Sequence, residues 1–285
     1  MLGSLMQFPQ QQPLLLQPPA PAVECWCPSS PQRNQCLAAT RNVLPQSLML
    51  DIGAHDGSDA LAFAEHSGHR VYSFEPSPSK VARVRESFAA SNLAPLLTLY
   101  PMALSNASGT VDFWVKAMLP GQQGALSSTQ GSQQDMLSKP EGPATRVEVE
   151  SGRLDSVVGP WQSVLHAKVD AQGHDAEVIF GAEALIASHR LRVLAFEVAP
   201  GLGEISAYVK AVMMLSQHHF QCYQCDSHAH QLAIRSPQEL HGHLTRLRNQ
   251  KFNLSILHTG WGVHSGFTDF VCVSLRATHQ SLAFT

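Results

Sequence analysis

The chain alternates between short apolar runs and stretches in which apolar residues recur three and four positions apart. The short runs have the length of buried strands, and the second pattern is typical of a helix with one apolar face. Val81, Val84 and Phe88, for example, form one stripe at i, i+3 and i+7. Strands are expected at residues 47–50, 70–74, 96–100, 110–115, 146–149, 163–169, 192–198, 220–223 and 270–275.

Helices are expected between these strands. The first begins at Ser58, which can cap a helix N-terminus, and ends at Gly68. A second follows a Pro-rich turn, and further helical patterns cover 154–158, 176–189 and 205–213. Strands that alternate with helices predict an α/β fold with a doubly wound, mostly parallel sheet. The last two strands are expected to run antiparallel.

Composition divides the chain into a leader and a folded domain. Residues 1–43 are rich in Gln, Pro and Ser, which predicts a disordered leader ahead of one domain at residues 44–285. Within that domain, residues 116–145 change to Gly, Gln, Ser and Pro. A structureless stretch of this length predicts a long loop or a lid over a site.

Charge and hydrophobicity exclude several classes of protein. The formal net charge of −3 provides no basic excess for a nucleic-acid partner. The sequence has no apolar run of about 18 residues, so no membrane span is expected. The compartment stays open: the absence of a recognisable signal peptide favours the cytoplasm, whereas cysteine pairs and two N-x-S/T sequons fit a secretory lumen.

The six cysteines allow three interpretations. Free buried thiols are the default expectation, and one or two disulfides would fit an oxidising lumen. Structural zinc would need four well-placed ligands, for which the C-x-x-C at 222–225 could combine with other cysteines or with His228 and His230. The pairing cannot be deduced from the sequence. The cysteines are Cys25, Cys27, Cys36, Cys222, Cys225 and Cys272.

The first candidate site follows the first strand. Asp51 ends this strand, Gly53 and Gly57 follow, and the next strand ends at Glu75. Glycine tolerates the turn, and a carboxylate about 20 residues later can accept the hydroxyl protons of a ribose. The G-x-G-x-x-G of dinucleotide sites is absent, and Asp51 would repel a pyrophosphate. A cationic nucleoside, S-adenosylmethionine, fits better, although a plain strand-to-helix connection would also explain the glycines.

The second candidate site follows the strand at 163–169. Lys168 and Asp170 stand at i and i+2 and therefore share one face of the sheet. They lie at the carboxyl end of a core strand, where open α/β sheets bind ligands. Gly173 allows a tight exit into the next helix. An equally good explanation is an ion pair at the strand end with Asp175 capping the helix.

Taken together, these segments resemble the FkbM-type S-adenosylmethionine-dependent methyltransferases. The resemblance runs from about residue 48 to residue 197, roughly half of the chain, and the order and spacing of its separate pieces make it specific. The matching residues are Leu50-Asp-Ile-Gly-Ala-His-Asp-Gly57, Val71-Tyr-Ser-Phe-Glu-Pro76, Ala103-Leu-Ser105, Leu154-Asp155, Lys168-Val-Asp-Ala-Gln-Gly-His-Asp175, Gly181-Ala182 and Phe196-Glu197.

The resemblance implies a Rossmann-like seven-strand methyltransferase sheet and methyl transfer to a hydroxyl, often on a sugar or small metabolite. It implies that Glu75 holds the ribose of S-adenosylmethionine, and that Ala103 lies near the adenine. Two residues depart from the family pattern: His55 replaces the usual Asn, and Asp175 replaces the usual Glu. The residues implied along the methionine end of the cofactor are Asp51, Gly53, Ala54 and Gly57.

The resemblance also places Lys168 and Asp170 beside the transferred methyl group. A hydroxyl acceptor loses a proton, so a general base helps, and Asp170 is the first candidate. His174 is the second, although a surface position at a helix start explains it better. Lys168 would orient Asp170 or the acceptor. Asp170 and Asp175 provide too few oxygens for a resident metal.

The expected partner is a small molecule or a glycan that accepts the methyl group. The alternative from another class is a catalytically inactive methyltransferase fold that serves as a binding or interaction module. His55 and Asp175 favour that alternative. The residues that argue against it are the intact Asp51, Glu75, Lys168 and Asp170.

Overall fold

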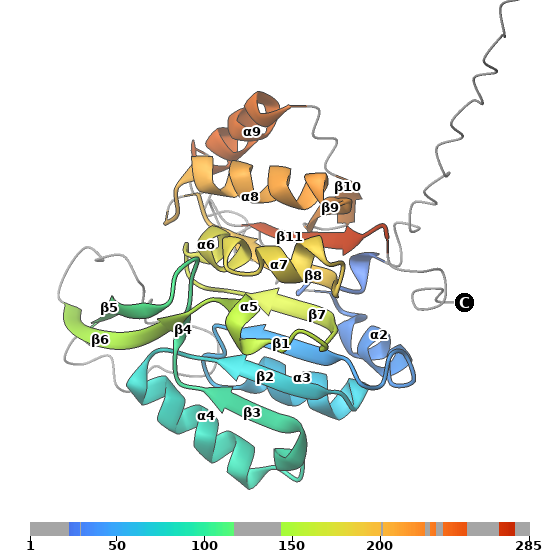
Figure 1. The fold of residues 1–285 in the computed structure, drawn as a ribbon, viewed down its shortest axis with the longest axis vertical. Coiled ribbons are helices and arrows are strands. Elements are labelled where there is room, and N and C mark those ends of the chain that lie inside the picture. The colour runs from blue at the N-terminus through green and yellow to red at the C-terminus, as the bar shows by residue number, and fades with distance from the viewer. Residues whose placement is uncertain are drawn as a thin grey trace, which may run out of the picture.

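The computed structural model describes residues 23–28, 30–116, 144–200, 202–225, 229–231, 236–249 and 268–276. These residues form a large twisted sheet with helices on both faces (Figure 1). Among them, no helix has the length and apolar character needed to cross a membrane.

The large sheet has the strand order β10-β9-β11-β8-β7-β1-β2-β3. The neighbours from β8 to β3 pair in parallel, whereas β11 runs antiparallel to both β8 and β9. The expected seven-strand sheet with antiparallel C-terminal strands is thereby confirmed, and the short β10 adds an eighth strand. The bounds are β1 Leu48–Ile52, β2 Arg70–Phe74, β3 Leu97–Tyr100, β7 Val164–Val169, β8 Leu191–Val198, β9 Phe220–Cys225, β10 Ala229–Gln231 and β11 Thr268–Ser274.

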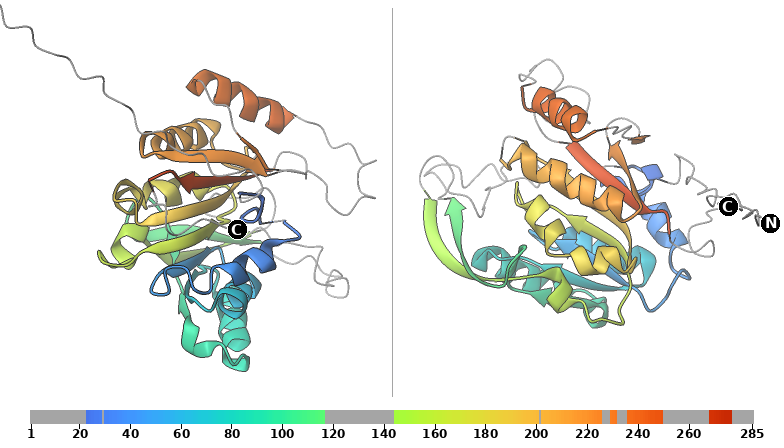
Figure 2. Two further views of the ribbon diagram at one scale, coloured as in Figure 1. Left: turned by 90° about the vertical axis from the view of Figure 1, so that its right-hand side faces the viewer. Right: turned by 45° about the horizontal axis from the view of Figure 1, so that its top comes forward.

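Two helical layers cover the sheet, as the turned views show (Figure 2). The central strand β1 is buried along its whole length because its side chains alternate between the two layers. Leu48 and Leu50 pack with one layer, and Met49 with the other. The first layer contains α5 Leu154–Val157, α6 Asp175–Phe180, α7 Glu183–Ala187, α8 Ile205–Gln217 and α9 Pro237–Asn249; the second contains α2 Arg33–Ala39, α3 Ser58–Ser67 and α4 Pro78–Ala90.

Short sequence signals correctly predicted some features of the helices and not others. Gly68 ends α3 in the left-handed conformation with φ +71°, as expected from the sequence. Val81, Val84 and Phe88 form the buried stripe of α4. The predicted cap at Ser58 is wrong, since the N-cap is Gly57, and Ser58 is the first helical residue. A 3₁₀ turn at Ala94–Leu96 precedes β3.

The helix predicted over 176–189 is two helices, α6 and α7. The break lies at Gly181, where a Cβ atom would collide with the carbonyl oxygen of Ser105. The carboxylate of Asp155 accepts hydrogen bonds from the backbone N–H groups of Ala184 and Leu185, at 3.0 and 2.9 Å. It therefore satisfies the first turn of α7 from another part of the chain, which the periodicity of the helix itself does not reveal.

The expectation of a disordered leader over 1–43 is wrong for the described residues between 23 and 40, which are ordered. This segment, here called the N-terminal segment, contains α2 and packs against the sheet layer that holds α3. Val23, Trp26 and Leu37 are almost completely buried. Because composition favours disorder only where too little apolar surface is buried, these few apolar residues outweigh the polar composition around them.

The expectation of free thiols is also wrong. All six cysteines form disulfides: Cys25–Cys36 within the N-terminal segment, Cys27–Cys225 to β9, and Cys222–Cys272 between β9 and β11. These bonds also remove the cysteines from consideration as zinc ligands. Of the two histidines suggested as ligands, His228 lies outside the described residues and His230 lies on β10.

A second, smaller sheet has the order β4-β6-β5, with β4 at Ala103–Leu104, β5 at Gly109–Lys116 and β6 at Ala144–Gly152. The antiparallel pair β5 and β6 extends from the body of the molecule (Figure 1). The predicted loop at 116–145 therefore begins and ends in strands, and its residues 117–143 lie outside the described residues.

Candidate functional site

The turn after β1 is shaped by its backbone. Gly53 has φ +81°, and a Cβ atom there would collide with the carbonyl oxygen of Asp170. The N–H groups of Gly53 and Ala54 both donate to the carbonyl of Phe74, at 2.9 and 3.0 Å. Glycine is thus required because the loop after β7 crosses this turn, a reason that the sequence alone does not give.

His55 continues this turn in the left-handed region, with φ +54°. Asn, Asp and His adopt this conformation more readily than most residues. The replacement of the family's Asn by His therefore preserves the backbone. Burial lowers the pKa of His55 below its ordinary value, with Lys80 as a second cause, so the ring is neutral at pH 7.

Glu75 follows β2 and is 4% exposed. Its Oε2 accepts the N–H of His55 and its Oε1 accepts the N–H of Ser77, both at 2.9 Å. Gly57, by contrast, faces α4, because a Cβ atom there would lie 2.9 Å from the ring of Phe88. The turn after β1 and the end of β2 are thus locked together through one carboxylate.

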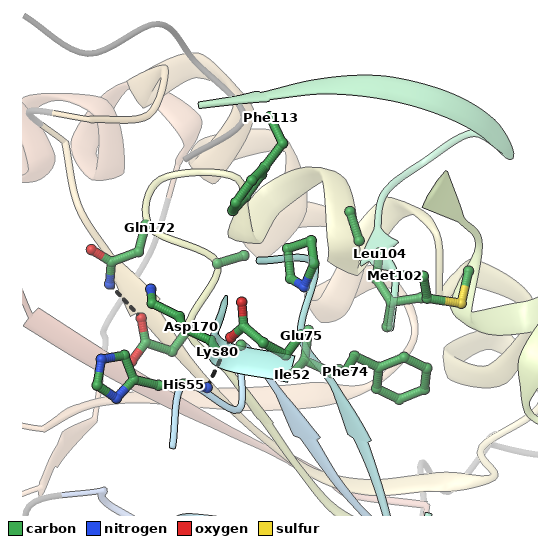
Figure 3. A pocket seen from close by; sticks show the side chains of 14 residues that line it. Ile52, His55, Phe74, Glu75, Lys80, Met102, Leu104, Phe113, Asp170 and Gln172 are labelled. Atoms are coloured by element: carbon green, nitrogen blue, oxygen red, sulfur yellow. Dashed lines mark hydrogen bonds between the residues drawn. The ribbon is translucent and has the colours of Figure 1, made fainter. Parts of the chain in front are cut away.

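A cavity of about 250 Å³ opens at the carboxyl ends of β1, β2 and β7 (Figure 3). Phe74, Met102 and Leu104 form one side, and Asp170 and Gln172 lie across from them. The described residues that line it are Ile52, Gly53, His55, Phe74, Glu75, Pro76, Lys80, Met102, Ala103, Leu104, Phe113, Asp170, Ala171 and Gln172.

Behind the polar side of the cavity, Lys168 is surrounded by carboxylates. Its Nζ lies 3.0 Å from Asp59, 3.5 Å from Asp51 and 3.6 Å from Asp170. Burial disfavours the charge of Lys168, but these carboxylates hold its pKa above the ordinary value. Lys168 is therefore a fixed cation, and it cannot act as a base.

Asp51 is fully buried, and among the described residues neither of its oxygens has a hydrogen-bond partner. Burial raises its pKa to about 6, an effect that Lys168 opposes and that Asp59 reinforces. A buried carboxylate without hydrogen bonds is costly. Its charge is compensated within the protein by Lys168, at 3.5 Å.

Side chains hold the loop after β7. Asp175 accepts the N–H groups of Ala171 and Gly173, both at 3.1 Å. Burial, reinforced by Asp170, raises the pKa of Asp175 to about 7. The amide nitrogen of Gln172 donates to Asp170 Oδ1 at 2.6 Å. The shorter acid at position 175 thus has a defined role in supporting the loop backbone.

His174 points to Ser105, with 2.9 Å between its Nε2 and the Ser105 Oγ. Burial lowers the pKa of His174 to about 4. Its ring is neutral at pH 7 and lies outside the residues that line the cavity. The arrangement gives His174 the role of joining the β7 loop to the end of β4.

Two further acids gather at the same edge. Glu197 on β8 pairs in register with Asp269 on β11. Burial and the nearby Asp170 raise the pKa of Glu197 to about 9 and that of Asp269 to about 6. Glu197 matched the family pattern without an assigned role; in the structure it stays protonated at pH 7, raised in pKa by burial and by Asp170.

The structure brings together only part of the site expected from the sequence. Gly53, Glu75, Ala103 and Asp170 line the cavity. The others are not among the residues that line it: they are Asp51, Ala54, Gly57, Lys168 and His174.

Sequence reasoning missed Asp59, Arg33 and Phe113. Asp59 follows the glycine turn by two residues, and the carboxylate could have been noticed in the first turn of α3. Phe113 reaches the cavity from β5. The alternation of apolar residues along β5 predicts which side of the strand Phe113 lies on, but not that this side borders the cavity. Arg33 lies far from the site in sequence, and no local pattern points to it.

The chain matches the family model of the methyltransferase FkbM domain over residues 51–254. It belongs to the FkbM methyltransferase family. The family identified from the sequence motifs is thus confirmed, and the match extends past residue 197, where the motif resemblance ended.

A curated relative is the 2-O-methyltransferase NoeI of Sinorhizobium fredii (strain NBRC 101917 / NGR234). It is 31% identical over 158 residues, which cover 51% of this chain and 61% of NoeI. The match therefore spans less than two thirds of NoeI. Both the family and this relative are named for methyl transfer.

Solved structures of methyltransferases are similar to this chain only at a low level. The methyltransferase FkbM from Methylobacillus flagellatus KT is 12% identical, with a TM-score of 0.44 and coverage of 80% of this chain and 44% of that one. An rRNA methylase from Streptococcus thermophilus is 12% identical, with a TM-score of 0.45 and coverage of 86% and 95%. Likenesses at this level carry no argument about activity, which has to come from the site.

Proposed function

We propose that this FkbM-family protein is an S-adenosylmethionine-dependent methyltransferase that methylates a hydroxyl group on a sugar or small metabolite. The observation that carries the proposal is the cavity, whose lining combines an apolar side with the carboxylate of Glu75. A nucleoside cofactor needs both features: an apolar surface for its base, and an acceptor for its ribose hydroxyls.

The residues present fit this cofactor. Phe74, Met102 and Ala103 would hold the adenine, and the Glu75 carboxylate would accept the ribose hydroxyl protons. The turn at Gly53 would face the methionine end. There Asp51 and Asp170 supply negative charge toward a cationic ligand, with Lys168 between them. When bound, S-adenosylmethionine supplies a methyl group on a sulfonium, which is already a good leaving group.

Asp170 is the proposed general base. Its side chain is 36% exposed, lines the cavity, and is oriented by Gln172 at 2.6 Å and Lys168 at 3.6 Å. The acceptor hydroxyl would pass its proton to Asp170 as its oxygen takes the methyl group. Alignment of the two reactants would supply most of the rate. His174 is engaged with Ser105 and is not needed for this step.

The acceptor class rests on two observations. The curated relative NoeI is a 2-O-methyltransferase, which supports a hydroxyl acceptor. The net charge of −3 and the acids at the carboxyl edge disfavour a polyanion. We therefore keep a small molecule or glycan as the proposed acceptor, and exclusion of nucleic acids stays a prediction.

The inactive binding module loses its main support. It rested on His55 and Asp175, and both replacements preserve the backbone conformation of their loops. Lys168 and Asp170 also keep an ion pair beside the cavity, which a binding role alone does not require.

Titration calorimetry with S-adenosylmethionine tests the cofactor site. We expect micromolar binding by the wild type and its loss in Glu75→Ala, because the ribose loses its acceptor. Glu86→Ala, an exposed carboxylate on α4, is the matched control and should bind like the wild type. Absence of binding by a folded wild type would refute the methyltransferase proposal and favour the interaction module.

The three disulfides support an oxidising compartment, because cytosolic thiols are kept reduced. Alkylation of the denatured protein, isolated without reductant, tests this. We expect the six cysteines to resist labelling until a reductant is added. Complete labelling without reductant would place the protein in a reducing compartment.

A further inference from the structure

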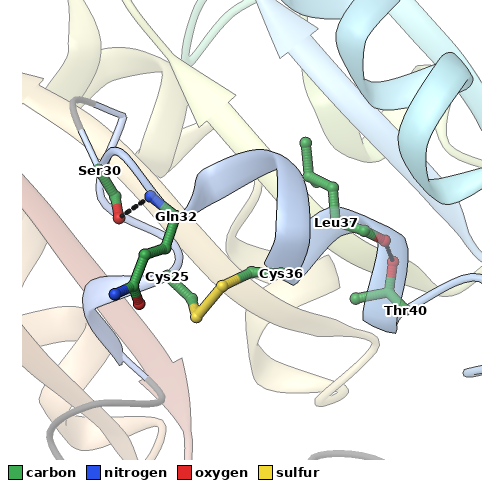
Figure 4. The surroundings of a disulfide bond; sticks show 6 residues. All are labelled: Cys25, Ser30, Gln32, Cys36, Leu37 and Thr40. Carbon is green, nitrogen blue, oxygen red and sulfur yellow. Dashed lines mark hydrogen bonds between the residues drawn. A yellow bond between two sulfur atoms is a disulfide. The ribbon is translucent and has the colours of Figure 1, made fainter.

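Arg33 lies at the start of α2 in the N-terminal segment, outside the part of the chain that matches the family. Two disulfides hold this segment. Cys25–Cys36 (Figure 4) closes a loop of the chain that includes position 33, and Cys27–Cys225 fixes the segment to β9. The position of Arg33 relative to the sheet is thus fixed covalently.

Arg33 is the outer end of a chain of ion pairs that leads to the cavity. Its Nη1 lies 2.6 Å from Asp59 Oδ1, and the other oxygen of Asp59 lies 3.0 Å from Lys168 Nζ. Lys168 in turn lies 3.6 Å from Asp170, which lines the cavity. One carboxylate is thus shared between a guanidinium and the ammonium beside the proposed base.

The surroundings keep Arg33 in place. Its guanidinium lies over the ring of Phe63, 4.9 Å from the ring centre, and its side chain is 17% exposed. Burial would raise the pKa of Asp59, but Lys168 and Arg33 outweigh it and hold that pKa at about 2. Asp59 therefore stays ionised, and both of its oxygens are occupied by cations.

We propose that Arg33 is a positioning residue of the methyltransferase site: it fixes Asp59, which fixes Lys168 between Asp51 and Asp170. This inference rests on the proposed function, because the effect ascribed to Arg33 is to keep the proposed cofactor and acceptor site ordered and correctly charged. The N-terminal segment then belongs to the site, and its disulfides serve the chemistry as well as stability.

The physical reason is competition for Lys168. Without Arg33, Asp59 can turn both oxygens toward Lys168 and draw it away from Asp170. The loss of a cation also leaves Asp51 in a more negative environment, so more of it is protonated at neutral pH. The charged groups that face Asp51 are Lys168, Asp59, Arg33 and Asp170.

The test measures S-adenosylmethionine affinity by calorimetry on the full chain with its disulfides intact. The variants are Arg33→Gln and Arg33→Lys, each also made with Asp59→Asn. Arg41→Ala is the matched control: Arg41 directly follows the N-terminal segment and donates to the carbonyls of Glu65 and His66, at the C-terminal end of α3. It reports on anchoring of the segment without touching Asp59.

We expect Arg33→Gln to bind about tenfold more weakly, the equivalent of one pKa unit of interaction. The loss of affinity should be larger near pH 6 than near pH 8. Near pH 6 the ionisation of Asp51 is incomplete and therefore sensitive to the loss of a nearby cation, whereas near pH 8 Asp51 is ionised in both proteins. Arg33→Lys should recover part of the affinity, and Arg41→Ala should bind like the wild type. In the Asp59→Asn background, Arg33→Gln should cost clearly less, because the part of the effect that passes through Asp59 is already absent.

Wild-type affinity in Arg33→Gln overturns this inference and leaves the proposed function standing. A loss that is equal at both pH values and undiminished in the Asp59→Asn background assigns Arg33 a purely structural role, which also overturns it. Failure of the wild type to bind overturns the proposed function itself. A poorly folded Arg33→Gln leaves the decision to Arg33→Lys, which keeps the cation: a loss of affinity that is larger near pH 6 and smaller in the Asp59→Asn background supports the inference, and a loss that is equal in all these conditions overturns it.

Discussion

The turns after β1 and after β7 meet at the cavity, but different forces hold them. The first depends on backbone geometry: Gly53 is left-handed and lies against the carbonyl of Asp170. The second depends on side chains, since Asp175 binds its N–H groups and Lys168 neutralises its start. The first turn should therefore be sensitive to added atoms, and the second to changes in charge.

The largest effect should come from Gly53→Ala. The new methyl group would collide with the carbonyl oxygen of Asp170 and would also strain the backbone, so we expect a loss of about 4 kcal/mol or more in the free energy of unfolding. Gly68→Ala is the matched control, because Gly68 has φ +71° but meets only the side chain of Arg41, at 3.8 Å. It should cost about 1 kcal/mol.

Denaturant unfolding of both variants measures the difference. Equal costs would mean that left-handed strain alone explains Gly53 and that the two turns do not interlock.

The next effect should come from Lys168→Met in the second turn. Removal of this cation leaves Asp51 buried without its ion pair, and we expect a loss of about 3 kcal/mol at pH 7. The loss should shrink as the pH falls toward about 6, because Asp51, whose pKa Lys168 no longer lowers, takes up a proton in the variant. Chemical denaturation at several pH values measures it.

Lys210→Met, an exposed lysine on α8, is the control and should change stability by less than about 0.5 kcal/mol. A cost for Lys168→Met that does not vary with pH would contradict the assignment of the effect to Asp51.

Asp175 should give the second turn a distinctive pH dependence. Its pKa is about 7 in the folded protein and about 4 when unfolded, because burial disfavours the charge. Between these values the folded state binds a proton that the unfolded state does not. The stability contributed by Asp175 is therefore fully present below about pH 4 and is lost by about pH 7.

Thermal unfolding of the wild type and of Asp175→Asn across this range isolates the effect from the other titrating groups. The advantage of the wild type over the variant should narrow as the pH rises. An advantage that widens instead would show that the hydrogen bonds from Ala171 and Gly173 keep Asp175 ionised.

The smallest effect should come from His174→Gln. The hydrogen bond to Ser105 is lost, at a cost of about 1 kcal/mol, and the affinity for S-adenosylmethionine should change little because His174 lies outside the cavity lining. Ser105→Ala removes the same bond from the other side and should behave alike. A large loss of methyl transfer in His174→Gln alone, with normal stability, would return His174 to the role of general base.

The prediction from sequence succeeded where a pattern is local. The strand at 70–74 was placed at its observed bounds because apolar residues run between an arginine and an acid. Glu75, Gly53 and Asp170 line one cavity, since parallel strands bring their carboxyl ends to one edge, and their role there stays a prediction. The prediction of one helix over 176–189 was wrong because contacts with Asp155 and Ser105, both distant in sequence, accompany a break at Gly181.

The sequence by itself determined the family, the α/β fold and the acids that end the core strands, because these depend on periodicity and on short motifs. The tertiary structure decided which of those acids face the cavity and which are buried behind it. It also brought Arg33, Asp59 and Lys168 together from separate elements. The physical reason is that an ion pair depends on distance in space, and disulfides such as Cys27–Cys225 fix distances that the order of residues does not encode.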